Sequence, residues 1–323
     1  MQPVRPVHTA PQAASHVQNQ TLTCRQCGSS ALRLLGPIPD ATVFAGQALD
    51  PPWGGGGLYE CSHCHVGLRL PIKPEAEFER LYAAASGQVW ISEGLRVDQR
   101  RVVQLLGSKL SSGHVLDVGC YDGTLLQALA PALHKHGVEL SAQAAELARQ
   151  RGVNIIAARI AELDLVEQRF DAICAVDVIE HVPNPGAFVD TLARLLAPGG
   201  WLFVSTGALD ARAWRWAAGQ YWYGCFPEHI SFISRAWAEQ MAARTGLILQ
   251  ASQTFAYEDL APRRRALLRL RFAWKLLGAR LSAGASAPRP ARPGGKPLRS
   301  LGQPGVFADH LLLAYRKPGQ TPT

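Results

Sequence analysis

Residues Val115 to Gly123 read VLDVGCYDG, and this stretch decides the fold. Its first four residues predict a short buried strand with Asp117 set into it. The turn that follows begins with Gly119, and residues 124–134 then have the composition of a helix. A strand, a glycine-rich turn and a helix in this order open a nucleotide-binding α/β unit. Glycine suits such a turn because it adopts backbone angles that a Cβ forbids and lets the chain approach a ligand closely.

A carboxylate further along the chain supports this interpretation. Glu139 lies at the end of a second predicted strand, 137–140, and follows Asp117 by 22 residues. A carboxylate at that place can accept hydrogen bonds from both hydroxyls of a ribose. The glycine spacing differs from the GxGxxG of dinucleotide-binding enzymes. The alternative is an ordinary α/β turn with a solvated Glu139.

The stretch resembles motif I of the class I S-adenosylmethionine-dependent methyltransferases. The later segments FDAICAVDVIEHVPNP and LLAPGGWLFVST resemble further motifs of that family, so the resemblance covers roughly 113–255. It implies that S-adenosylmethionine is bound, with the glycine turn facing its methionine part and Glu139 binding its ribose. Residues 157–161 lack the acidic residue that often binds adenine, so backbone groups and Ile160 would do so. The expected cofactor-binding residues are Asp117, Gly119, Cys120, Gly123, Glu139, Leu140, Ile160 and Asp177.

Strands and helices alternate through this region. After helix 124–134 and strand 137–140, the sequence predicts helices 141–151 and 185–197, and strands 154–157, 170–177, 201–205, 247–254 and 310–315. Such alternation indicates an α/β fold with a parallel sheet covered on both faces. The resemblance implies a Rossmann-like sheet of seven strands, six parallel and the last antiparallel. About fifty residues separate the last two strands, which usually form a hairpin in this fold.

Two CxxC pairs precede the α/β region, and they consist of Cys24, Cys27, Cys61 and Cys64. Each pair places two thiolates in a tight turn, and two turns complete a tetrahedral site for zinc. A site of four thiolates is closed and therefore structural, and the metal would supply much of the folding energy of a zinc-ribbon-like module, 21–73. His63 and His65 are alternative ligands, and redox dithiols or unpaired thiols are the alternative to a metal site. Trp53–Gly57 predicts a flexible loop inside the module.

The region after the fifth strand is expected to contact the substrate, because six of the thirteen residues 214–226 are aromatic. Flat faces with polar edges suit sugars, rings or apolar chains. A lid packed on the core is the alternative. The expected substrate-binding residues are Trp214, Tyr221, Trp222, Tyr223 and Glu228.

The segment PEHISFIS, residues 227–234, resembles an EHxSxxS segment of the zinc-containing deoxysugar C-methyltransferases. The resemblance implies that His229 is a general base, although Phe226 stands where those enzymes have a tyrosine. Those enzymes also have a further C-terminal α/β domain, for which this chain is too short. His181, at the end of the fourth strand, is the second candidate base, and its alternative role is a structural cap on the Pro183 turn.

Composition sets the remaining expectations. The chain of 323 residues is 47% apolar and has no apolar run long enough for a transmembrane helix. Residues 1–20 lack the apolar centre of a signal peptide and predict a disordered tail, which favours a cytoplasmic protein.

Two helices, from Pro74 to about Ala85 and from about Gly94 to Leu110, form a linking segment, 74–112, that could cover the cofactor. The methyltransferase domain would then be 113–323.

The net charge of +8 is concentrated in a basic insert, 262–300, which has eleven Arg or Lys and no acidic residue. Leucines and a tryptophan recur there at helical spacing, and 283–300 predicts disorder. The apolar residues of the expected helix are Leu267, Leu270, Trp274, Leu277 and Leu281. We expect a basic amphipathic helix that brings the protein to an anionic membrane surface. The alternatives are a helix packed on the sheet and a helix that binds RNA phosphates.

Together these patterns predict methyl transfer from S-adenosylmethionine to a small-molecule or glycan acceptor, in saccharide or natural-product biosynthesis. One alternative is an RNA methyltransferase that uses the basic insert. Outside the insert the chain has no excess of basic over acidic residues, and it has no base-methylation motif of the Asn-Pro-Pro-Tyr type. A nucleic-acid partner is therefore the weaker prediction. A non-catalytic protein that only binds the cofactor is the third interpretation.

Overall fold

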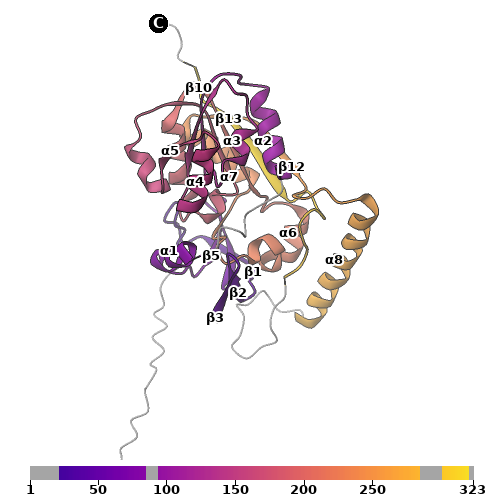
Figure 1. Ribbon diagram of the computed structural model, residues 1–323. Coiled ribbons are helices and arrows are strands. Elements are labelled where there is room, and N and C mark those ends of the chain that lie inside the picture. Colours follow the sequence, from indigo (N-terminus) through magenta and orange to yellow (C-terminus); the bar gives the residue numbers. More distant parts are fainter. Residues whose placement is uncertain (1–21, 85–93, 284–299, 320–323) are drawn as a thin grey trace, which may run out of the picture.

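The computed structural model describes residues 22–84, 94–283 and 300–319, which form a large α/β layer and a smaller β layer beneath it (Figure 1). The expected tail, 1–20, lies outside the described residues. The segment 283–300, also expected to be disordered, lies outside them except at its two ends.

The large sheet has seven strands in the order β12-β13-β10-β9-β6-β7-β8. They are β6 Gly113–Val118, β7 Leu133–Val138, β8 Asn154–Ala157, β9 Phe170–Val176, β10 Leu196–Gly207, β12 Ile248–Phe255 and β13 His310–Arg316. Strand β13 pairs antiparallel with β10 and β12, and all other neighbours pair in parallel. The predicted sheet of six parallel strands and an antiparallel last strand is confirmed.

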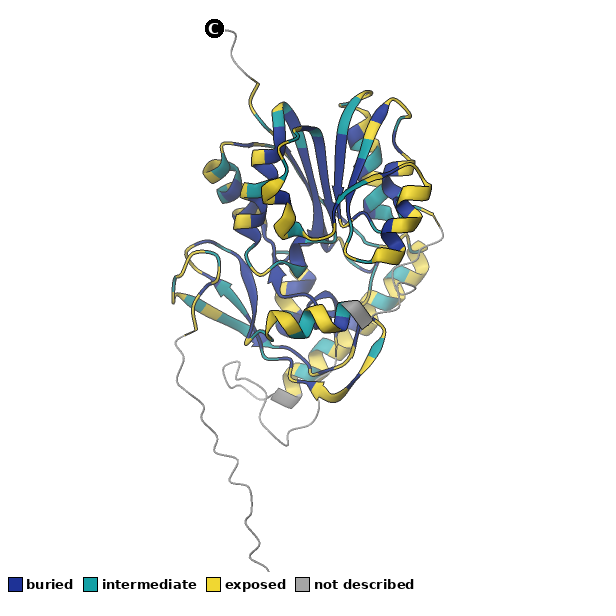
Figure 2. Ribbon diagram, turned by 60° about the vertical axis from the view of Figure 1, so that its left-hand side comes forward, coloured by how far each residue is buried: buried dark blue, intermediate teal, exposed yellow. Residues whose placement is uncertain are grey.

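Helices cover both faces of this sheet, and Figure 2 shows the strands as a buried layer between them. Side chains alternate along a strand, so Val115 packs into one hydrophobic cluster while Leu116 and Val118 pack into the other. The face of Val115 is covered by α2 Val97–Gly107, α3 Thr124–Gln127 and α4 Ala142–Gln150; the opposite face is covered by α5 Pro185–Leu195 and α7 Arg235–Thr245. The chain therefore has the expected two-sided α/β core.

Three predicted elements have other boundaries than expected. The helix expected over 124–134 ends at Gln127, and β7 already begins at Leu133. Pro131 explains the early end, because a proline there has no N–H to donate to the carbonyl of Gln127 and its ring would clash with the preceding turn. Strand β10 is longer than expected, since it continues through an irregularity between Leu196 and Trp201.

The smaller layer is a four-stranded antiparallel sheet in the order β1-β4-β5-β11. Its strands are β1 Leu32–Pro37, β4 Gly57–Cys61, β5 Gly67–Leu70 and β11 Ser231–Phe232. Three of them come from the N-terminal module and the fourth from the α/β region. The module expected over 21–73 is thus joined to the rest of the protein by a shared sheet.

The segment between the two CxxC pairs is folded, and the loop expected over Trp53–Gly57 is the connection of residues 54–56 between two strands; its flexibility stays a prediction. The segment forms the hairpin of β2 Ala41–Phe44 and β3 Gln47–Trp53, whose rings pack on α1 Glu75–Ala84. Gly55 then passes so close to the backbone that a Cβ would lie 2.1 Å from the carbonyl oxygen of Ile38. Glycines here permit close packing as well as a turn.

The basic insert forms α8 Pro262–Ala283, which stands at the side of the molecule between β12 and β13 in the chain (Figure 1). The short helix α6 Arg212–Ala217 follows β10 and lies in the smaller layer. Among the described residues, no helix has both the length and the apolar character needed to cross a bilayer.

Candidate functional site

The glycine turn, which we define as residues 119–123 with Glu139, follows β6 at the carboxyl end of the parallel strands. Gly119 and Gly123 have φ angles of +74° and +78°, values that disfavour any residue with a Cβ. A Cβ on Gly119 would also lie 2.7 Å from a methyl carbon of Val178. The positions predicted from the sequence are therefore the ones where the backbone requires glycine.

Glu139 holds the turn together through its carboxylate. One oxygen accepts a hydrogen bond from the backbone N–H of Tyr121 at 2.9 Å, and the other from the N–H of Ser141 at 2.7 Å. Burial raises the pKa of Glu139, and these two hydrogen bonds oppose that effect. The carboxylate thus stands at the strand end where a ribose-binding residue was expected.

The other predicted cofactor residues surround this turn in different environments. Leu140 is exposed and Ile160 half-buried, whereas the Cys120 side chain lies in the core. Asp117 is buried in β6, and this burial raises its pKa to about 8. These placements do not test the predicted contacts, which remain predictions.

Asp177 lies at the end of β9 and joins two elements that the sequence did not connect. One carboxylate oxygen accepts hydrogen bonds from Arg96 at 3.1 Å and from the hydroxyl of Tyr257 at 2.9 Å. The other oxygen is buried and has no hydrogen-bond partner among the described residues. Burial and Asp98 raise the pKa of Asp177, and Arg96 opposes them. A ligand with a hydrogen-bond donor would satisfy the remaining oxygen.

A second group, which we name the histidine edge, consists of Tyr82, His181, Tyr223 and His229. The rings of His181 and His229 have centroids 4.9 Å apart. Nδ1 of His229 lies 2.7 Å from the carbonyl oxygen of Tyr223, and Nδ1 of His181 lies 3.0 Å from the hydroxyl of Tyr82. Burial and His181 hold the pKa of His229 well below its ordinary value, and burial also lowers the pKa of His181. Both rings are therefore neutral near pH 7.

Glu180 lies beside the two histidines. Ligand atoms of Glu180, His181 and His229 are within 4.8 Å of one another, so the three side chains could share a proton or a divalent metal. Both carboxylate oxygens of Glu180 already accept hydrogen bonds, from the hydroxyls of Tyr223 and Thr206. Because both oxygens of Glu180 already accept hydrogen bonds, a shared proton is favoured over a bound metal ion.

Arg69 of β5 connects the smaller layer to the histidine edge. Its buried guanidinium donates hydrogen bonds to the carbonyl oxygens of His229 at 3.1 Å, Gly224 at 2.7 Å and Phe226 at 2.8 Å. A fourth bond goes to Gly55 of the N-terminal module. Because these carbonyls belong to the loop that carries His229, Arg69 fixes the position of that residue.

The predicted substrate-binding aromatics are mostly buried. Trp214 and Tyr221 have no exposed surface, and both pack in a cluster with Ile38 and Leu58 of the N-terminal module. Tyr221 and Trp222 also donate hydrogen bonds to Asp309. The arrangement favours the alternative of a lid packed on the core for these residues. Tyr223, Glu228 and the exposed Phe226 lie closer to the histidines.

The four cysteines of the CxxC pairs converge as predicted. The Sγ atoms of Cys24 and Cys64 are 3.5 Å apart, those of Cys27 and Cys61 are 3.6 Å apart, and all four lie within 4.8 Å of one another. A tetrahedral zinc site with Zn–S bonds of about 2.3 Å requires S–S distances of roughly 3.8 Å. Neither His63 nor His65 belongs to this cluster. The donor set and its spacing fit zinc.

Four residues around the two histidines and Asp177 were not predicted: Arg69, Tyr82, Arg96 and Tyr257. They come from β5, from α1, from the residue before α2 and from the segment after β12. Only Arg69 has a local signal, since it is a single arginine inside the buried strand Gly67–Leu70. Buried arginines require partners, and such a residue can be recognised from sequence as structurally important.

The chain is similar in sequence to known methyltransferases. A family model described as a methyltransferase domain matches residues 92–251. A ubiquinone biosynthesis O-methyltransferase of Xylella fastidiosa (strain 9a5c) is 44% identical over 105 residues, which are 30% of this chain and 43% of that protein. One from Thiobacillus denitrificans (strain ATCC 25259 / T1) is 30% identical over 165 residues, which are 47% of this chain and 71% of that protein. The match thus spans less than half the length of the Xylella relative.

Among solved structures, the N-methyltransferase NodS of Bradyrhizobium japonicum WM9, in complex with S-adenosyl-L-homocysteine, is 18% identical to this chain. The superposition covers 75% of this chain and 97% of NodS, with a TM-score of 0.43.

Proposed function

The chain belongs to the family of class I S-adenosylmethionine-dependent methyltransferases, and on that premise we propose that it methylates a hydroxyl group of a small-molecule acceptor. The observation that carries this proposal is the buried His229, whose ring lies 4.9 Å from that of His181 in the segment after β9, at the same end of the parallel strands as the glycine turn. The relatives named O-methyltransferases of ubiquinone biosynthesis support an oxygen acceptor on a small molecule.

The glycine turn and the strand ends would hold the cofactor. Glu139 would bind the ribose hydroxyls, and the buried carboxylates of Asp117 and Asp177 would face a ligand that carries positive charge. The oxygen of Asp177 that has no partner among the described residues fits a ligand with hydrogen-bond donors. When bound, S-adenosylmethionine supplies a methyl group on a sulfonium that is ready for displacement.

His229 would take the proton that the acceptor hydroxyl loses. Its Nδ1 lies against a carbonyl oxygen, which only accepts hydrogen bonds, so Nδ1 carries the proton and Nε2 keeps a lone pair. A base whose pKa lies below neutrality is unprotonated at pH 7 and ready to accept. Tyr223 fixes this tautomer through its carbonyl group, and His181 is the neighbouring base that could pass the proton to solvent.

The four cysteines would hold one structural zinc ion. A site with four protein ligands has no open position for a substrate, so its contribution is to the fold. The second CxxC pair lies between β4 and β5, and Arg69 of β5 donates a hydrogen bond to the loop that contains His229. The metal would therefore support the histidine edge from a distance.

Product analysis tests the proposed acceptor. Purified protein is incubated with S-adenosylmethionine labelled in its methyl group and with separate small-molecule, glycan and RNA fractions of a bacterial extract. We expect label in the small-molecule fraction, bound to oxygen. Label in nucleosides would favour the RNA alternative, and label in sugars would favour the glycan one. Cofactor binding without label in any fraction would mean a protein that binds but does not transfer.

A further inference from the structure

Helix α8 uses only one of its sides to pack on the protein. Phe272 is buried, and Leu276 and Ala279 pack against the same aromatic cluster that contains Tyr221 and Trp222. The ring of Phe272 also meets that of Phe307, with centroids 4.9 Å apart. These contacts hold the helix in place, so the residues on its opposite side are not needed to anchor it.

The opposite side, which we name the outer face, is a stripe of large apolar side chains. It consists of Leu267, Leu270, Trp274, Leu277 and Leu281, which recur at spacings of three and four residues. Their exposed fractions range from 52% for Leu277 to 78% for Trp274. Single exposed apolar residues are ordinary, but a continuous row of five marks an interaction surface. The sequence alternative in which this stripe packs on the sheet is wrong.

Positive charge surrounds this stripe. Helix α8 has seven Arg or Lys and no acidic residue, and none of the seven forms an ion pair with a described residue. Three arginines, Arg263 to Arg265, occupy the first turn, where the helix dipole already favours negative charge. An isolated helix gains nothing from this arrangement, whereas an anionic partner would stabilise it.

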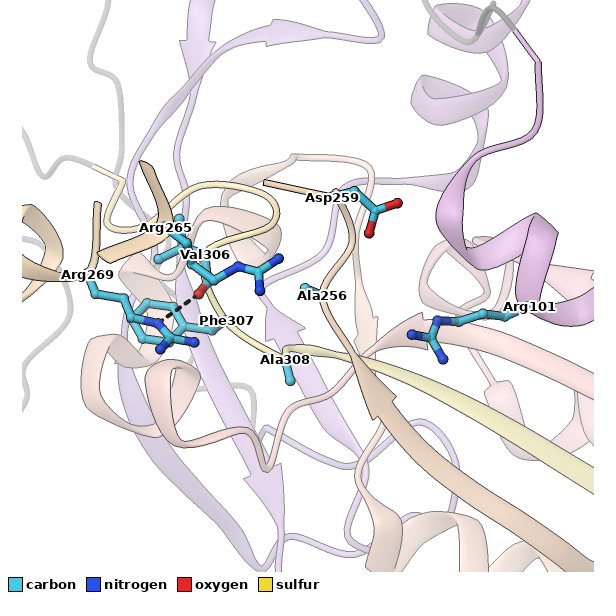
Figure 3. Close-up of a pocket in the computed structure, with 8 residues that line it drawn as sticks. All are labelled: Arg101, Ala256, Asp259, Arg265, Arg269, Val306, Phe307 and Ala308. Carbon is cyan, nitrogen blue, oxygen red and sulfur yellow. Dashed lines mark hydrogen bonds between the residues drawn. The ribbon is translucent and has the colours of Figure 1, made fainter. Parts of the chain in front are cut away.

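A hollow of ≈ 310 Å³ lies beside α8 on its packed side, away from the outer face. Figure 3 shows Arg265 and Arg269 of α8 on one side of it and Arg101 of α2 on the other. The Nε atoms of Arg265 and Arg269 bind backbone carbonyls, and this holds their guanidinium groups in place. Asp259 also lines the hollow, but Arg100 already pairs with it at 2.6 Å. Guanidinium groups in such a cluster suit a phosphate.

We propose that the outer face of α8 docks onto an anionic lipid bilayer. The apolar stripe would enter the boundary between headgroups and acyl chains, and the flanking cations, such as Arg271 and Lys275, would meet anionic headgroups. A second copy of this chain fits less well, because two such faces would bring like charges together. RNA would use the cations but leave five exposed apolar side chains unexplained.

Vesicle flotation tests this proposal with the full-length protein. We expect it to float with vesicles of phosphatidylcholine and phosphatidylglycerol at low salt, and to bind much less to phosphatidylcholine alone. The double variant Trp274→Glu/Leu277→Glu should lower the partition coefficient at least tenfold, because each change removes a large apolar contact. The charge variant Arg271→Glu/Lys275→Glu should remove the preference for the anionic lipid.

The matched control is Leu165→Glu, since Leu165 is 84% exposed but lies far from α8 in the chain. It should float like the wild type, and all variants should keep the same affinity for S-adenosylmethionine, which shows that they are folded. The proposal fails if the wild type stays unbound with both vesicle types, or if Leu165→Glu loses as much binding as the double variant. It also fails if ultracentrifugation shows a dimer that only the stripe variant dissociates, or if RNA is retained equally by wild type and stripe variant.

Discussion

The glycine turn and the histidine edge lie near the same ends of the parallel strands, yet they are assembled from the chain in different ways. The turn and the side chains that hydrogen-bond to it fall within 117–151, so its geometry is almost entirely local. The histidine edge combines α1, the segment after β9 and the loop before β11, and Arg69 reaches it across 160 residues. The glycine turn can form wherever β6 and α3 form, whereas the histidine edge requires the N-terminal module.

Removing a metal ligand should therefore have the most different effects on the histidine edge and on the glycine turn. Structural zinc sites contribute apparent binding energies of roughly 10–16 kcal/mol, so Cys61→Ser should unfold much of the smaller layer. We expect methyl transfer to disappear while calorimetry still detects S-adenosylmethionine binding to the α/β layer. Zinc content, measured by atomic emission, should fall from one equivalent to near zero.

The control for this change is Cys225→Ser, because Cys225 is outside the cluster and its thiol donates to the backbone carbonyls of Gly219 and Tyr221, as a serine hydroxyl also can. It should keep its zinc and its activity. If Cys61→Ser loses the zinc but transfers methyl groups at the normal rate, the dependence of the histidine edge on the metal is disproved.

Arg69→Met tests the same connection at a single contact. The change leaves four carbonyl oxygens without their donor, three of them on buried residues, and we expect a loss of about 3–5 kcal/mol in the free energy of unfolding. In the folded fraction kcat should fall, while the affinity for S-adenosylmethionine should change little. Arg33→Met on the same sheet is the matched control, since Arg33 is largely exposed. Equal kcat in the two variants would contradict the positioning role of Arg69.

The contrast between local and distant contacts also explains which parts could be predicted from the sequence. The alternation of strands and helices, the roles of Gly119 and Gly123, and the four-cysteine cluster each depend on residue types at fixed spacing, and they could be predicted. The contacts of Arg69 and Arg96 could not, because they join segments whose proximity exists only in the folded chain. The aromatic run 214–226 was predicted to face a substrate for a related reason: composition does not show which side of a segment meets the core.

His229→Gln tests the histidine edge by its chemistry. A positioned base contributes typically 10²–10⁴-fold to a reaction rate, and glutamine cannot accept the proton. We expect kcat to fall by about this factor with an unchanged dissociation constant for S-adenosylmethionine, measured by calorimetry. His134→Gln, an exposed histidine on β7, is the control. A loss of less than fivefold would transfer the role of base to His181 or to water.

Glu139→Ala tests the glycine turn. The change removes the predicted bonds to the ribose, each worth about 1.5–3 kcal/mol, and also the two bonds that brace the turn. We expect the affinity for S-adenosylmethionine to fall at least tenfold, while the thermal midpoint moves only slightly. Glu146→Ala, on the exposed side of α4, should bind as the wild type does. Equal affinities for wild type and Glu139→Ala would exclude Glu139 from the cofactor site.

The smallest expected effect is a pH dependence that originates in Asp117. Burial raises its pKa from the ordinary 3.8 to about 8, so the carboxyl is protonated in the free protein at pH 6 but ionised in the unfolded chain. Its contribution to stability is complete below pH 4 and disappears as the pH rises through 8. A cationic ligand prefers the ionised form, so binding of S-adenosylmethionine should release a proton at pH 6.5 and tighten towards pH 8. Calorimetry in two buffers of different ionisation enthalpy measures this proton. Asp117→Asn should bind without releasing it, and a wild type that binds equally well from pH 6 to 8 would show that Asp117 is already ionised. In that case the field of Arg96 prevails over burial, and the glycine turn is negatively charged before the ligand arrives.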